Sequence, residues 1–521
     1  MDKKERIESD NTLKKVASGT SIVFIGLLIG MLFNFLFQVL IARNWTETEF
    51  GIFSISFSVL SIATVISTLG FQQGLTVNIA FRRGKKDYAK IRNFISSSIF
   101  IGLLVSIIVG VFVFFLSELI AVEIFRETAL IRPLKIISIG IPFFSLFQIL
   151  ISIYRGFDQV KQIVLYKDII SNGFIFIFIL SIVIFEKSFL YVYYGLVASF
   201  AITVIIVSYR SIKKLKSINF LKMNSVISPA AKELVFFSLP LLGTAMLNLL
   251  ITWTDILMLG IIKTPAEAGL YKVAYLIAGF ISFPLSALLT IHVPVFSGLF
   301  ARKKFEEMKK NFLIITKWVC SFSLPLFIFI FLFPEDALRL LFGAEYAFAS
   351  TALRILSFGY IFSCFVGPCG ATIMSMGRPK FIMLTTFATA VTNIILNIIL
   401  IPDYGFIGAA YASTISLVTM NIIKILKLYK ISGIKPIGKN IIKPTLIFIS
   451  ITTILYYYFF KSLDFTFPIF VLLFFVFNFI YFVGFILTKS LEFEDLNLIK
   501  IFERKKGGFI TKIRYFLSKF I

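Results

Sequence analysis

Long apolar stretches, separated by short polar segments, run along nearly the whole chain. Each has about 20 residues or more, enough for a helix to cross the ~30 Å hydrocarbon core of a bilayer. The pattern predicts an all-α integral membrane protein with about fourteen transmembrane helices and no soluble catalytic domain. The predicted spans are 18–41, 52–79, 94–116, 133–154, 164–185, 190–209, 234–260, 269–299, 312–333, 351–374, 381–401, 405–426, 444–460 and 467–488.

An internal repeat relates the first twelve spans. The stretch "TETEFGIF" at 46–53 returns as "TPAEAGLY" at 264–271, an offset of 218, and "LKIISIG" at 134–140 meets "LRILSFG" at 353–359, an offset of 219. Since the repeat unit has six spans, an even number, both copies have the same orientation in the membrane. The sequence therefore predicts two parallel six-helix repeats, as in a two-lobed transporter, followed by two additional helices.

The predicted organisation follows this repeat. It comprises an N-lobe at 12–232, a C-lobe at 233–430, the two additional helices at 431–490 and a basic cytoplasmic tail at 491–521.

Composition and charge agree with a membrane protein. A hydrophobic content of 58% and a mean hydropathy of +0.94 exclude an ordinary soluble fold. The net charge of +25 is distributed unevenly, with 41 Lys and Arg against 14 acids in the segments on the side of the N-terminus and 7 against 12 on the other side. This asymmetry predicts a plasma (inner) membrane protein with both termini in the cytoplasm, and it explains the charge without nucleic acid.

The sequence carries no catalytic or metal-binding motif. Its three cysteines, Cys320, Cys364 and Cys369, all lie in predicted spans and indicate neither a disulfide framework nor a metal site. GxSxG, HExxH and P-loop motifs are absent, and the external loops are short and lack clustered histidines. The protein is therefore predicted not to be an enzyme and to need no cofactor.

Three stretches resemble a known family. They are "ASGTSIVFIGLLIGMLFNFLFQVLIARNWTETEFGIFSI" at 17–55, "LLFGAEYAFASTALRILSFGYIF" at 340–362 and "SMGRPKFIMLTTFATAVTNIILNIILIPDYGFIGAAYAS" at 375–413. In this order, and on a six-plus-six repeat, they resemble the polysaccharide-transporter branch of the multidrug/oligosaccharidyl-lipid/polysaccharide superfamily, whose fold is MATE-like. The resemblance covers about residues 12–427.

This resemblance implies a flippase. Such a protein turns a polyprenyl-diphosphate oligosaccharide from the cytoplasmic to the outer leaflet for cell-surface polysaccharide assembly, by rocking its two lobes in alternating access. The implied partners are the lipid-linked oligosaccharide, membrane lipids, and a glycan polymerase or glycosyltransferases of the same pathway. The related lipid II flippases also have fourteen spans, and their last pair flanks a groove for the lipid tail.

Basic residues within the predicted spans are candidates for binding the diphosphate of such a substrate. Lys135 and Arg354 occupy matched positions in the two repeats, and Lys272 lies in the eighth span. A cation inside a bilayer usually faces a wet cavity or a partner, and arginine adds a bidentate geometry that suits phosphate. Lys135 and Arg354 also lie within a turn of the outer ends of their spans, so the alternative is that they reach toward lipid headgroups.

Asp255 and Lys272 are predicted to lie at similar depth on consecutive antiparallel spans, as an ion pair. Such a pair is either structural or opens when H+ or Na+, the two candidate coupling ions, takes the carboxylate. His292 is the only histidine; proton sensing is one interpretation and a satisfied core histidine is the other.

Two further groups complete the predicted site. Asn34 and Gln38, one turn apart on the first span, present two amides that would suit sugar hydroxyls or bonds between helices. Lys161 and Lys380 lie in matched cytoplasmic turns and are candidates for gating.

Two other functions compete with the flippase. An ion-coupled multidrug exporter of the same superfamily would need acidic and aromatic residues for a cationic drug, whereas the intramembrane bases here outnumber the acids. A membrane glycan polymerase or ligase would carry a sizeable external loop with catalytic groups, which this sequence lacks.

Overall fold

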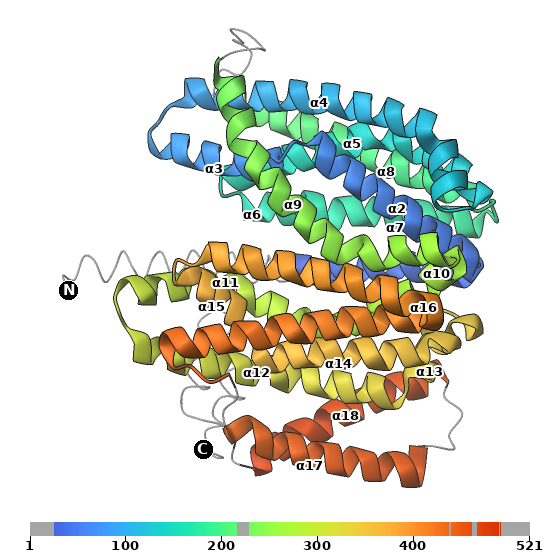
Figure 1. The fold of residues 1–521 in the computed structure, drawn as a ribbon, viewed down its shortest axis with the longest axis vertical. Coiled ribbons are helices and arrows are strands. Elements are labelled where there is room, and N and C mark those ends of the chain that lie inside the picture. Colours follow the sequence, from blue (N-terminus) through green and yellow to red (C-terminus); the bar gives the residue numbers. More distant parts are fainter. Residues whose placement is uncertain (1–24, 216–228, 437–438, 461–465, 489, 491–521) are drawn as a thin grey trace. The chain divides into compact units, whose positions relative to one another are not determined.

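The computed structural model describes residues 25–215, 229–436, 439–460, 466–488 and 490. Over these residues the chain is all-α, without strands (Figure 1), which confirms the predicted fold class. The beginning of the first predicted span and the predicted tail at 491–521 lie outside the described residues. The chain divides into two compact units, Met1–Gly269 and Leu270–Ile521, which are described separately below.

The first unit begins with the helix Ile25–Asn44. It continues through α2 (Glu47–Ser67), α3 (Phe71–Gly84), α4 (Tyr88–Leu119), η1 (Ile120–Ile124), η2 (Thr128–Leu130), α5 (Ile131–Gly156), α6 (Val160–Ile163), η3 (Val164–Ser171), α7 (Asn172–Ile184), α8 (Leu190–Leu215) and α9 (Pro229–Ile262). Helix α5 is central, since it packs against α2, α3, α4 and α8. Helix α9 packs against α2, α3 and α4, although the repeat assigns it to the C-lobe. The predicted lobe boundary at 232–233 therefore stays a prediction.

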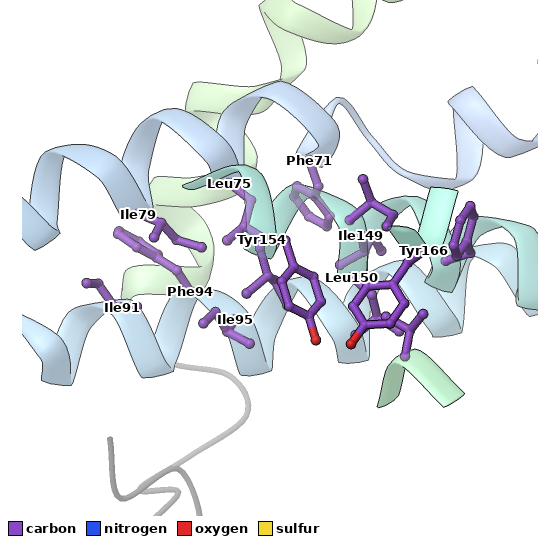
Figure 2. Packing of buried hydrophobic residues seen from close by; sticks show 14 of the residues in the cluster. Phe71, Leu75, Ile79, Ile91, Phe94, Ile95, Ile149, Leu150, Tyr154 and Tyr166 are labelled. Carbon is purple, nitrogen blue, oxygen red and sulfur yellow. The ribbon is translucent and has the colours of Figure 1, made fainter. Parts of the chain in front are cut away.

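A buried hydrophobic cluster lies within this unit, and Figure 2 shows how its side chains pack. Its side chains come from α3, α4, α5, η3, α8 and α9, and the members labelled in the figure are Phe71, Leu75, Ile79, Ile91, Phe94, Ile95, Ile149, Leu150, Tyr154 and Tyr166. The rings of Tyr154 and Tyr166 lie 5.3 Å apart. The Ser211 hydroxyl of α8 donates to the Tyr154 hydroxyl at 3.0 Å, so one polar contact is built into the apolar packing.

The second unit contains the later helices. These are α10 (Pro265–Gly279, whose first turn belongs to the first unit), η5 (Phe280–Ser282), α11 (Phe283–Ala301), α12 (Phe305–Leu332), α13 (Pro334–Leu341), η6 (Ala344–Ala349), α14 (Ser350–Val366), α15 (Cys369–Ser375), α16 (Pro379–Ser432), α17 (Lys439–Leu455), η7 (Tyr456–Phe460) and α18 (Phe467–Leu487). Helix α14 packs against α12 and α16, while α17 and α18 pack against each other and against α12.

Two predicted spans are broken rather than continuous. The span at 52–79 divides into α2 and α3, because Leu69 and Gly70 have positive φ values of 49° and 76°. The span at 351–374 divides into α14 and α15 at Gly367, whose φ of 65° and ψ of −149° end the helix. An added Cβ at Gly367 would lie 2.3 Å from the Thr316 hydroxyl oxygen, so a glycine is required there on both counts.

The 54-residue element α16 contains a sharp reversal. Its backbone is non-helical at Gly405, and the Asn393 amide nitrogen donates to the Ser413 hydroxyl at 3.3 Å. Residues 20 positions apart would lie ~30 Å apart in one straight helix, so the two halves fold back on each other. They correspond to the separate spans predicted at 381–401 and 405–426.

Twelve helices of the described residues are long and apolar enough to cross a membrane, with α16 counted once. Helix α17 has 17 residues and is not among them. The predicted number of fourteen is therefore not confirmed, although the multi-pass membrane architecture is.

The repeat is visible in local structure. Thr46 caps α2 by accepting a hydrogen bond from the Glu49 amide, and Thr264 does the same for Glu267 at the start of α10. The two turns that precede α4 and α12 each contain a left-handed lysine, Lys86 and Lys303, both with φ of 57°. The matched stretches of sequence thus encode helix starts and turns of the same kind.

Candidate functional site

The first helix and η3 pack closely against each other at a contact that we call the Gly30–Asp168 seam. Gly26 and Gly30, one turn apart, face Val164 and Asp168. A Cβ added to Gly30 would lie 2.6 Å from the Asp168 Cβ and 2.8 Å from its carbonyl oxygen. Only glycine permits this approach, which brings the backbone of η3 directly against the first helix.

The segment η3 is a π-helix of eight residues. Such segments insert an extra residue into a helix and occur frequently at functional sites. The following residue, Asn172, donates from its side-chain amide to the Gly30 carbonyl at 3.1 Å, which fixes the register. Asp168 is half-buried beside this contact, and its carboxylate makes no hydrogen bond or ion pair with any residue of the described ranges.

The two amides predicted on the first helix lie beyond this seam. Gln38 is buried, while Asn34 is exposed. The Gln38 amide nitrogen donates to the Asn34 side-chain oxygen at 2.9 Å and to the Asn34 carbonyl at 3.1 Å. The pair is therefore pre-ordered on one face, with the Asn34 amide left accessible; its role in binding sugar stays a prediction.

Replacing Gly30 with Ala tests the seam. Because the new methyl group would overlap backbone atoms of Asp168, we expect the variant to lose ~1–3 kcal/mol of stability, the usual cost of overpacking. The matched control is Gly84→Ala, since a Cβ there meets no atom within 4 Å. Thermal unfolding of both purified variants in detergent should show a lower Tm for Gly30→Ala only; equal Tm values would contradict the packing described here.

A buried polar network lies in the second unit. Tyr271 of α10 donates from its hydroxyl to Ser413 at 3.3 Å, and Ser413 also receives the Asn393 amide. The Asn397 amide in turn donates to the Asn393 side-chain oxygen at 3.2 Å. Polar groups at this depth are costly in a bilayer unless they are satisfied or serve a function. This network was not predicted from the sequence, although the four-residue spacing of Thr385, Thr389, Asn393 and Asn397 places them on one helix face.

Lys272 follows Tyr271 in α10 and is buried, at 9% exposure. Its ammonium group lies 5.5 Å from the centroid of the Tyr275 ring, which also contacts the Tyr360 ring at 6.2 Å. Asp255, on α9 of the first unit, is 3% exposed. Both predicted partners are thus withdrawn from solvent, and their ion pair, which would join residues of different units, stays a prediction.

The matched cations Lys135 and Arg354 have similar surroundings in their own units. The Lys135 ammonium lies 5.7 Å from the centroid of the Phe114 ring on α4. Arg354 donates from Nε to the Phe331 carbonyl of α12 at 3.3 Å. Each half-buried cation therefore reaches the end of the helix that precedes it in the repeat, α4 in one case and α12 in the other.

The remaining predicted residues divide into exposed and buried ones. Lys161, on α6, and Lys380, at the start of α16, are both exposed. His292 is 1% exposed; its Nε2 lies 2.8 Å from the Thr372 hydroxyl, and Phe296 stacks on its ring at 3.7 Å. The Thr372 hydroxyl also lies within hydrogen-bond distance of the Pro368 carbonyl, at 2.9 Å. His292 Nδ1 is buried and has no hydrogen-bond partner in the described ranges.

Comparison with known proteins identifies the family. The model of the family described as "Polysaccharide biosynthesis protein" matches residues 16–300, more than half of the chain. The chain belongs to this family. A second model, MatE, matches residues 240–399. The predicted resemblance to the polysaccharide-transporter branch of the superfamily is thereby confirmed.

Two curated relatives support membership of the polysaccharide biosynthesis family. The chain is 26% identical over 168 residues to the probable low-salt glycan biosynthesis flippase Agl15 of Haloferax volcanii, a match that spans 32% of this chain and 35% of that protein. It is 24% identical over 404 residues to the capsular polysaccharide biosynthesis protein CapF of Staphylococcus aureus, covering 76% of this chain and 94% of CapF.

Among solved structures, the lipid II flippase MurJ in an inward closed conformation superposes with a TM-score of 0.69 at 17% identity. The match covers 92% of this chain and 99% of MurJ, so it shows a shared fold, including the MATE-like architecture. The family match at 16–300 contains the Gly30–Asp168 seam, Lys135 and Lys272. Arg354, Asn393 and Asn397 fall within the MatE match.

Proposed function

We propose that this protein is a flippase that moves a polyprenyl-diphosphate-linked oligosaccharide from the cytoplasmic to the outer leaflet of the plasma membrane. The observation that carries the proposal is the combination of family and fold: the chain belongs to a polysaccharide biosynthesis family and shares its fold with a lipid II flippase over 92% of its length. A relative over part of the chain, Agl15, also bears the name of a glycan flippase. Transport leaves the substrate chemically unchanged, so the protein is not an enzyme in this proposal.

The polar groups have distinct roles in this proposal. Lys135, Arg354 and Lys272 attract the diphosphate, whose charge would otherwise be unpaired in the bilayer. The amides of Asn34 and Gln38 bind sugar hydroxyls. Alternating rocking of the two lobes then exposes these groups to each leaflet in turn, and both termini lie in the cytoplasm, as the distribution of Lys and Arg favours.

In this proposal a carboxylate couples transport to an ion gradient. We place Asp168 ahead of Asp255, because Asp168 is part of the π-helical segment η3 and its carboxylate forms no hydrogen bond or ion pair with the described residues. A proton or a sodium ion bound there would neutralise a charge at the seam and change how η3 packs on Gly30. His292 stays a candidate proton sensor, and Lys161 and Lys380 stay candidates for gating in the matched turns.

Deletion of the gene tests the proposal in cells. Lipid-linked oligosaccharide should accumulate in the cytoplasmic leaflet, and surface glycan should decline at least tenfold, because assembly outside lacks its substrate. Extraction of lipid-linked sugars, with and without an externally added glycosidase, measures how much oligosaccharide stays in the cytoplasmic leaflet. The amount of surface glycan is measured on intact cells. Normal surface glycan in the deletion strain would show that this chain is not the flippase for that glycan.

A further inference from the structure

The two turns that contain the left-handed lysines repeat another feature. Each contains two cations that form no ion pair with the described residues, and an exposed phenylalanine lies a few residues away in the chain. In the first unit the turn joins α3 to α4 and contains Lys85 and Lys86; in the second it joins α11 to α12 and contains Arg302 and Lys303. The aromatic residues are Phe81, 54% exposed, and Phe305, 48% exposed.

Acidic residues around the first turn are already engaged. Glu233 accepts from Arg82 at 3.0 Å and from Lys90 at 2.7 Å, and Asp158 pairs with Arg83. Lys85 and Lys86 form no ion pair with any residue of the described ranges. The Lys85 ammonium instead lies 4.6 Å from the centroid of the exposed Phe81 ring, which holds a cation beside an apolar surface.

The turn of the second unit differs in one respect, because Glu306 is exposed and forms no ion pair with the described residues. Glu307 accepts from Lys304 at 2.7 Å. Arg302 and Lys303 are exposed and form no ion pair within the part of the chain that the structure describes. Phe305, two residues after Lys303 in the chain, packs edge-on against the partly buried Phe300 at 6.0 Å.

The backbone at these turns favours a residue other than lysine. A φ of 57° strains any side chain with a Cβ, and glycine adopts it freely. In both repeats the strained position is a lysine that makes no ion pair with the described residues. Leu69, Arg126, Asp158 and Glu186 also have positive φ values, so the strain by itself does not show that these two turns need a positive charge.

We propose that each turn is a binding site for the phosphate headgroup of an anionic glycerophospholipid. The exposed ring of Phe81 or Phe305 lies in the acyl region near the interface, where aromatic side chains are favoured. The two unpaired cations of the same turn then contact the phosphate. The site uses cations that the proposed transport mechanism does not, and it places one bound lipid at the same turn of each repeat.

Thermal unfolding in mixed micelles tests this inference. We expect phosphatidylglycerol, but not phosphatidylcholine, to raise the Tm of the wild-type protein by several degrees. The variants Lys85→Gln/Lys86→Gln and Arg302→Gln/Lys303→Gln should each lose about half of that increase. The matched control is Lys309→Gln/Lys310→Gln, which removes two exposed cations from the first turns of α12 that lie away from the turn, and it should keep the full increase.

Glycine variants separate charge from backbone geometry. Lys86→Gly and Lys303→Gly relieve the strain, so their Tm in phosphatidylcholine should equal or exceed that of the wild type, while their response to phosphatidylglycerol should fall. The inference is overturned if the turn variants respond like the control, if phosphatidylcholine stabilises equally, or if only polyprenyl phosphate produces the increase.

Discussion

Neutralising Lys135 or Arg354, as Lys135→Gln or Arg354→Gln, is expected to reduce delivery of lipid-linked glycan to the outer leaflet at least tenfold. A hydrogen bond between charged groups contributes ~1.5–3 kcal/mol, and 1.4 kcal/mol corresponds to roughly a factor of ten. Protein abundance in the membrane should remain close to that of the wild type, because each side chain is only half-buried and makes one contact with the preceding helix.

The double variant makes this prediction more specific. If both cations serve one diphosphate, the second substitution should add little to the first, since residues that act as a unit are not additive. Lys187→Gln, at an exposed lysine between α7 and α8, is the matched control and should transport normally. A role in reaching lipid headgroups predicts the opposite: export by the double variant would then equal that of the control, and the phosphate site would have to be abandoned.

Replacing Asp168 with Asn should abolish the acceleration of transport by an ion gradient while leaving the fold intact. Asn has nearly the shape of Asp but cannot bind a proton at neutral pH, so the packing against Gly30 should be kept. We expect the rate of gradient-driven transport to fall about a hundredfold, which corresponds to an increase of ~2.7 kcal/mol in the activation free energy. The Tm should change little, in contrast to Gly30→Ala.

Asp403→Asn provides the control for this experiment, because it removes an exposed carboxylate at the reversal of α16 and should leave transport unchanged. Proton and sodium gradients are applied separately, so that the coupling ion is identified by the one that accelerates the wild type. Gradient-driven transport at the wild-type rate by Asp168→Asn would transfer the coupling role to another group, with Asp255 the next to test.

The all-α, multi-pass architecture could be predicted because the length of each apolar stretch is a local property of the sequence; the orientation that the charge asymmetry favours stays a prediction. The repeat could be predicted because the two copies share residues that start helices. Thr46 and Thr264, for example, cap α2 and α10. Breaks within spans were not predicted. The pattern of apolar residues passes unchanged through Leu69 and Gly70, where the chain turns by adopting positive φ values.

The candidate site could be predicted only in part. Cations within spans stand out against apolar neighbours, so Lys135 and Lys272 were proposed from the sequence; the structure shows their surroundings, and their role in binding stays a prediction. Asp168 was not predicted, because its position near the end of a span makes it look like an ordinary interfacial residue. Its significance depends on η3 meeting Gly30, a contact between residues 138 positions apart that spacing in the sequence does not reveal.

The most direct test of the flippase is transfer between leaflets by the purified protein. Proteoliposomes would contain a polyprenyl-diphosphate oligosaccharide in both leaflets, and a membrane-impermeant glycosidase added outside would digest whatever reaches the outer leaflet. The account predicts digestion of nearly all the substrate in vesicles with the wild-type protein, and of about half in protein-free vesicles and in those with the Lys135→Gln/Arg354→Gln variant. Digestion that stops at half with the wild-type protein, under either ion gradient, would contradict the account.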